Sequence, residues 1–190
     1  LRSSKPPIRE AACRAAARHD LPSNLIPPLL ESFLLGKEIS LRVSAQKALL
    51  SGLPDGPLKT ALQYASAKRP EKTKLPLEPE VASLISSNAE KYLADADTTY
   101  RVRVATILAD TAAADDEALK ERLVGHVKGN NPTLRHGALH ALAHLLQRTT
   151  NVTIDNYATL VAYLEQQKAF RGRGSEATRL GAAELIAALA

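Results

Sequence analysis

Several residue types that carry chemistry are scarce in this sequence. Its 190 residues include one cysteine, two phenylalanines, no tryptophan and no methionine. The single Cys13 excludes an internal disulfide and cannot by itself supply a metal site. Because Cys13 stands among alanines and arginines, we interpret it as a small apolar residue on a helix.

Motifs of catalysis and of membrane insertion are also missing. The sequence has no apolar run long enough to cross a bilayer and no signal-peptide pattern. It has no glycine-rich phosphate loop after a strand, no nucleophile elbow and no Cys/His metal spacing. We therefore expect an intracellular protein, cytoplasmic or nuclear, that makes no membrane contact. We expect no enzyme activity, cofactor or small-molecule substrate.

What is present favours helices. Alanine and leucine dominate, and runs of β-branched residues are rare. The formal net charge is +5 and the pI is near 9.4. This mild basic excess permits contact with nucleic acid or acidic proteins without demonstrating either.

Periodicity, capping residues and prolines predict a series of helices separated by short breaks. The stretch 68–79 holds three prolines and alternating charges, and we interpret it as an irregular linker. The predicted helices are 6–19, 25–36, 40–52, 57–67, 79–93, 100–108, 117–128, 130–147, 154–169 and 175–189.

The helix at 130–147 is the best formed of these. Asn130 or Asn131 can cap it, and Pro132 suits its first turn. An apolar stripe runs along one face, made of Leu134, Ala138, Leu142 and Leu145. A helix this short and rich in alanine cannot bury its stripe alone, so it needs similar neighbours.

Every second helix carries an arginine near its start, a small or apolar residue three positions on, and usually a large apolar residue seven positions on. The arginine spacings are 33, 59, 34 and 44, by subtraction, and the widest interval holds an extra helix and the linker. Arg103 competes with Arg101 for the third register. The set is Arg9–Ala12–Ala16, Arg42–Ala45–Leu49, Arg101–Val104–Leu108, Arg135–Ala138–Leu142 and Arg179–Ala182–Ile186.

This pattern resembles the HEAT and armadillo repeats. Residues 25–30 resemble the first helix (A) of such a repeat, and residues 134–139 resemble its second helix (B). The resemblance implies an all-α fold: a right-handed α-solenoid of about five stacked antiparallel helix pairs over residues 1–190. The family's Asp before the arginine is missing from most units. Since the chain begins with Leu1 and ends in apolar residues 185–190, we expect a segment of a longer array.

The most prominent candidate site is a stripe of three histidines, His136, His140 and His144, at successive i, i+4 positions. Two such histidines can hold a metal on a helix, but this helix offers no carboxylate as a further ligand. We therefore favour a polar, pH-sensitive surface opposite the apolar stripe, where a partner docks.

The basic residues leave two interpretations open. An arginine in the first turn of a B helix can bond carbonyls or a carboxylate of the neighbouring repeat, or form a ridge that binds phosphates; Arg101 and Arg135 are such candidates. The stretch 168–173, with Phe170, Arg171 and Arg173, can contact nucleic acid or be an ordinary solvated loop.

These observations predict a non-catalytic scaffold. We expect it to bind a protein partner or a larger assembly along a concave face lined by the B helices. The alternative is binding of RNA or DNA through the basic helix starts and the 168–173 loop.

Overall fold

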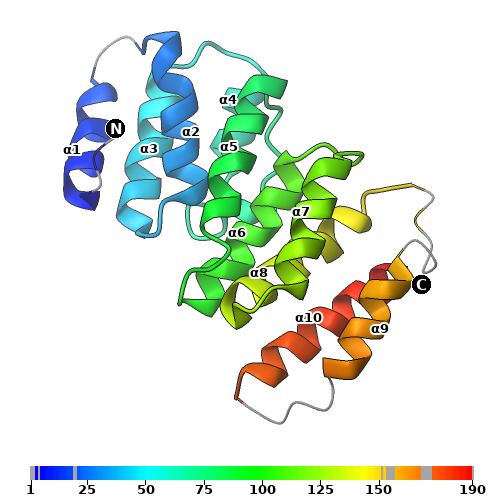
Figure 1. The fold of residues 1–190 in the computed structure, drawn as a ribbon. Coiled ribbons are helices and arrows are strands. Elements are labelled where there is room, and N and C mark those ends of the chain that lie inside the picture. Colours follow the sequence, from blue (N-terminus) through cyan, green and yellow to red (C-terminus); the bar gives the residue numbers. More distant parts are fainter. Residues whose placement is uncertain are drawn as a thin grey trace. The chain divides into compact units, whose positions relative to one another are not determined.

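The computed structural model describes residues 3, 5–18, 21–150, 152, 157–167 and 173–189, with the backbone alone for residues 163–167 and 173–178. This part of the chain is all-α, as predicted: it holds α-helices and short 3-10 helices and no strand (Figure 1). The elements are α1 (Pro6–Ala16), η1 (Ser23–Leu25), α2 (Ile26–Leu35), α3 (Ile39–Gly52), α4 (Pro57–Tyr64), η2 (Pro70–Lys72), α5 (Pro79–Lys91), α6 (Thr98–Thr111), α7 (Glu117–Lys128), α8 (Pro132–Leu146), α9 (Ala158–Gln167) and α10 (Arg173–Leu189).

Polar side chains cap several of the described helices. Asp97 Oδ1 accepts from the backbone N–H of Tyr100 at the start of α6. Asn131, and not Asn130, caps α8 and accepts from the N–H groups of Thr133 and Leu134. Pro132 is the first residue of α8, where its missing N–H costs no hydrogen bond.

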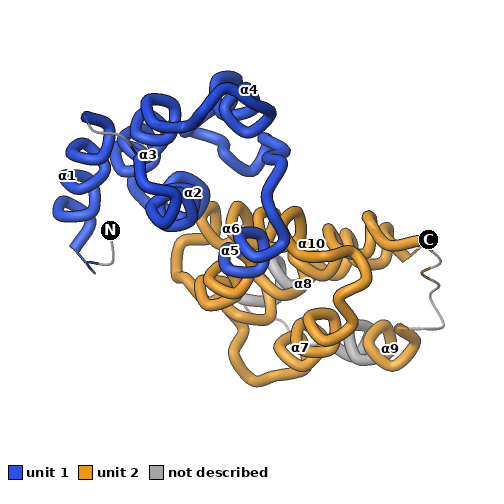
Figure 2. The backbone as a smooth tube through the Cα atoms, turned by 90° about the horizontal axis from the view of Figure 1, so that it is seen from above, with its two compact units in different colours: residues 1–85 blue, residues 86–190 orange. Residues whose placement is uncertain are grey.

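The chain divides into two compact units, residues 1–85 and residues 86–190 (Figure 2). The division falls within α5, between Ile85 and Ser86. A continuous array over residues 1–190 stays a prediction.

In the first unit, α3 is the central helix and packs against α1, α2 and α4. Its inward side chains Leu41, Ala45 and Leu49 are fully buried. Phe33 of α2 is also fully buried. Cys13 lies on α1, on a helix as predicted; its free thiol is buried, and burial raises its pKa.

In the second unit, α8 is the central helix and packs against α6, α7 and α10. Ten of its fifteen residues are buried, on all its sides. The approach is close: a Cβ added at Gly137 would stand 2.4 Å from the carbonyl oxygen of Leu93. The backbone at Leu93 thus leaves room only for glycine at position 137.

Candidate functional site

Three of the repeat arginines bind backbone carbonyls just before their own helices. Arg42, Arg101 and Arg135 are each the fourth residue of their helix, α3, α6 and α8. In each case a guanidinium nitrogen donates to the carbonyl six residues back: Gly36 at 2.7 Å, Asp95 at 2.5 Å and Gly129 at 2.7 Å.

Each arginine also makes further bonds. Arg42 donates to the carbonyls of Lys37 and Ala67, and Arg135 donates to that of Val127. The predicted bonding of backbone carbonyls is thus observed for Arg42, Arg101 and Arg135. Most acceptors, however, belong to the segment before the same helix and not to the neighbouring repeat. A positive side chain suits this place, because the end of a helix exposes carbonyls that lack partners within the helix.

These contacts contradict the phosphate-ridge interpretation at two positions. Arg42 and Arg101 are 5% and 6% exposed, so a phosphate cannot reach them without displacing their present acceptors. Burial lowers the pKa of Arg101, opposed by the nearby carboxylates of Asp95 and Asp97. Arg135 remains part-exposed.

The histidine stripe is not the surface that the sequence predicted. His136 and His140 are 3% and 6% exposed, and only His144 is part-exposed. The physical reason is that α6 and α10 cover the face of α8 that helical periodicity assigns to solvent. The prediction of an exposed histidine docking surface was therefore wrong for His136 and His140.

In the second unit the two histidines connect an arginine to a carboxylate through successive side-chain contacts. We call these four residues the histidine network: Arg101, His136, His140 and Glu184. Arg101 Nε lies 3.2 Å from His136 Nδ1. The two Nε2 atoms of the histidines lie 3.0 Å apart, and His140 Nδ1 lies 2.5 Å from a carboxylate oxygen of Glu184. The two rings also meet edge to face.

The donors along this network fix the tautomers. Arg101 Nε can only donate, so His136 Nδ1 accepts and its proton stands on Nε2. That proton is donated to His140 Nε2, which leaves the proton of His140 on Nδ1, facing the carboxylate of Glu184. Both imidazoles are therefore neutral in the bonded network, and a further proton on either ring places two donors against each other.

The pKa shifts agree with neutral rings. Burial, followed by the charges of His140 and Arg101, lowers the pKa of His136 from 6.5 to about 4. Burial also lowers the pKa of His140, with Glu184 opposing the shift and His144 and Arg101 adding to it.

This arrangement does not suit a metal. A metal on His136 Nε2 would need the ring proton on Nδ1, where Arg101 already presents an N–H. No group of three or more possible ligands is found among the described residues.

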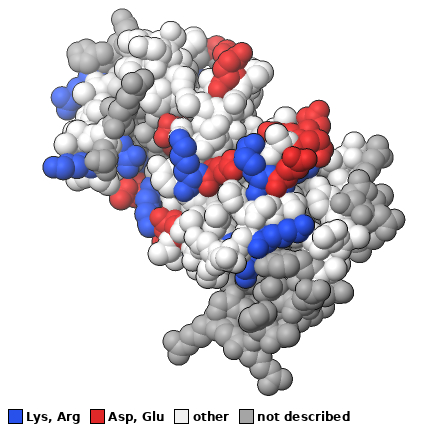
Figure 3. All heavy atoms as spheres, in the orientation of Figure 1, with Lys and Arg blue, Asp and Glu red and all other residues white. Residues whose placement is uncertain are grey.

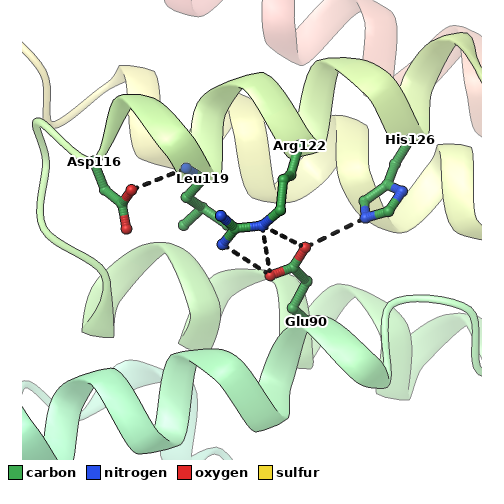
Figure 4. A network of polar contacts seen from close by, with 5 residues as sticks. All are labelled: Glu90, Asp116, Leu119, Arg122 and His126. Carbon is green, nitrogen blue, oxygen red and sulfur yellow. Dashed lines mark hydrogen bonds and ion pairs between the residues drawn. The ribbon is translucent and has the colours of Figure 1, made fainter.

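A second polar cluster, which the sequence did not reveal, joins α5 to α7 (Figure 4). The carboxylate of Glu90 accepts from Arg122 Nη2 at 3.2 Å and contacts His126 Nε2 at 3.3 Å. Arg122 and His126 stand four residues apart, so both side chains project from one face of α7. The available signal was that spacing, but nothing in the sequence pointed to Glu90 as their shared partner.

The predicted basic loop lies largely outside the described residues. Lys168–Gly172, including Phe170 and Arg171, are not described, and Arg173 begins α10 without a described side chain. The nucleic-acid prediction for this stretch is therefore untested.

One side of α3 and the equivalent side of α6 stay open to solvent. On α3 this side carries Ser40, Ser44, Lys47 and Ser51, which are exposed or part-exposed. These positions lie two residues before the repeat arginine and two, five and nine residues after it. On α6 the same positions hold Thr99, Arg103, Thr106 and Asp110, which are also exposed or part-exposed. We call these residues the open stripes. On α8 the corresponding positions include Gly137 and His140, which are buried, so the stripe does not recur on that helix.

No family model matches the chain, nor does any curated protein or solved structure. Among the described residues, no helix is both long and apolar enough to span a membrane.

Proposed function

We propose that this chain is a non-catalytic segment of an α-solenoid that holds a protein partner by distributed contacts. The partner would contact the open stripe of α3 in the first unit and that of α6 in the second, in an intracellular setting. The shared register of the stripes on α3 and α6 is the observation that carries this proposal.

The chemistry of the stripes suits a polypeptide partner. Their hydroxyl groups on Ser40, Ser44 and Thr99 can donate to and accept from peptide groups, while Lys47 and Asp110 offer charges of both signs. Such a surface gives many modest contacts, as in solenoids that bind extended partners.

The nucleic-acid alternative is weakened by the contacts of the arginines on which it relied. Arg42 and Arg101 are buried and donate to protein acceptors. On the face drawn in Figure 3, the described Lys and Arg side chains lie among Asp and Glu side chains and form no continuous positive stripe. A mixed surface attracts a polyanion weakly, because neighbouring carboxylates repel phosphates.

The first test of the proposal measures binding to labelled oligonucleotides of about 20 nucleotides by fluorescence anisotropy at two salt concentrations. The oligonucleotides are single- and double-stranded RNA and DNA. We expect no binding, or weak binding that responds little to salt. Tight binding that weakens steeply with added salt would favour the nucleic-acid alternative and overturn the scaffold proposal.

The second test maps the partner surface. The chain is immobilised, partners are recovered from an extract, and each recovered protein is re-measured as a purified component. We expect the variant Ser44→Arg, Lys47→Glu to lose at least tenfold in affinity for the partner. A control variant, Ala118→Arg at an exposed position of α7, should retain it. Equal loss in both variants, or in neither, would refute the assignment of the surface.

A further inference from the structure

The first helix repeats the pattern of the others. Arg9 is the fourth residue of α1, as Arg42 is the fourth residue of α3. The positions one before, three after and seven after the arginine are Ile8, Ala12 and Ala16 in α1.

The same three positions are buried elsewhere and open on α1. In α3, which packs against α2, the equivalent residues Leu41, Ala45 and Leu49 are all fully buried. In α1, by contrast, Ile8 is 53% exposed, and Ala12 and Ala16 are part-exposed. The described contacts of α1 are principally with α3, and its one buried residue is Cys13, on a different side from Ile8.

The arginine itself gives a second, independent sign. Arg9 Nε is buried and has no hydrogen-bond partner among the described residues. In Arg42, Arg101 and Arg135 the equivalent Nε donates to Ala67, His136 and Val127. A buried donor without an acceptor is unfavourable, so this atom is suited to an acceptor that docking would supply.

We propose that the face of α1 formed by Ile8, Arg9, Ala12 and Ala16 is a docking site for one amphipathic helix of a partner. The site fits a helix of the α2 type, since α2 packs against α3 and Gly36, at the end of α2, lies beside Leu41 and Arg42. Such a helix carries an apolar stripe like Leu29, Leu30 and Phe33, which are fully or almost fully buried in this chain. Its last carbonyls can accept from the guanidinium of Arg9. Gly36 accepts in this way from Arg42 Nη1, and Val127, in the last turn of α7, accepts from Arg135 Nε. The negative end of the helix dipole adds to the attraction for Arg9. This site does not depend on the proposed open stripes.

The test supplies the chain with a second copy of α2 as the probe. Residues 22–37 are fused directly to Lys5, so that the copied Gly36 stands six residues before Arg9, as Gly36 stands before Arg42. Fusion replaces weak association in solution by a high effective concentration, so an absent contact is informative. We expect amide hydrogen exchange in α1 to slow by at least about tenfold relative to the unfused chain, equivalent to about 1.4 kcal/mol.

Substitutions then show which contacts produce the protection. Ile8→Glu and Arg9→Ala should each remove most of the gain in the fused chain, and each should change exchange in the unfused chain by about twofold or less. A fused copy with Leu29, Leu30 and Phe33 replaced by serine should give no gain.

The proposal is overturned if the fused helix leaves α1 unprotected, or if the gain persists in Ile8→Glu. It is also overturned if the unfused chain self-associates in analytical ultracentrifugation and Ile8→Glu abolishes this association. The occupant would then be a second copy of the chain.

Discussion

The histidine network makes the stability of the second unit depend on pH, and His136→Gln is the variant that isolates this dependence. In the folded chain the pKa of His136 is about 4, against an ordinary value of 6.5. Between these values the unfolded chain binds a proton that the folded chain does not. The stabilising contribution of neutral His136 is therefore complete above about pH 6.5 and is lost as the pH falls towards 4.

The magnitude follows from the shift. At pH 5, about 1.5 units below the ordinary histidine pKa, the folded state has lost about 2 kcal/mol relative to pH 7.5 through this residue. Arg101 on α6, Glu184 on α10, and His140 and His144 on α8 are the charged or titratable groups that act on the two buried rings. Of these, only Glu184 favours protonation of His140.

Glutamine can replace the contacts of His136 without its titration. Its side-chain oxygen can accept from Arg101, and its amide can donate towards His140. We expect His136→Gln to be less stable than the parent at pH 7.5, and to lose about 2 kcal/mol less between pH 7.5 and pH 5. His144→Gln is the matched control, because His144 lies on the same helix but is not among the groups that shift the pKa of His136. It should keep the pH dependence that His136 causes.

The assay is urea unfolding followed by far-UV circular dichroism, since the chain has no tryptophan. Amide exchange in α8 assigns the transition to the second unit. Equal losses of stability in the parent and in His136→Gln between pH 7.5 and pH 5 would refute a neutral, buried His136.

Four further substitutions test the packing of the helices by urea unfolding. Arg42→Ala should destabilise the first unit by about 3 kcal/mol, because buried carbonyls lose a charged donor; a loss below about 0.5 kcal/mol would contradict this role. Gly137→Ala should cost about 2 kcal/mol through its clash with Leu93. Gly125→Ala on α7, where an added Cβ meets nothing within 4 Å, should instead stabilise by about 0.5–1 kcal/mol; equal signs for the two glycines would refute the steric explanation. Glu90→Gln should change stability by less than about 1 kcal/mol, because Arg122 is half exposed, and a larger loss would show that the cluster holds α5 to α7.

Local sequence determined the helices well. The cap of α8 at one of two adjacent asparagines, the proline at its start and the termination of α2 near Gly36 all depend on a few neighbouring residues, so the sequence could predict them. The repeat arginines could also be recognised in the sequence, because each stands at the same place in its helix and donates to the carbonyl six residues before it.

The candidate site was less predictable, because its contacts join residues far apart in the chain. Glu184 meets His140 from α10, and Glu90 meets Arg122 from α5. No local pattern specifies such pairs. The division at residues 85 and 86 likewise falls inside a helix, where the sequence shows no break.

The helix α8 shows which properties depend on local sequence and which depend on tertiary packing. The sequence by itself determined where α8 begins, how it is capped and which face is most apolar, because these properties depend on residues within a few turns. The tertiary structure alone decided that the histidine face is also buried, because exposure depends on how many neighbours a helix has. Surrounded by α6, α7 and α10, α8 holds His136 and His140 as neutral internal groups.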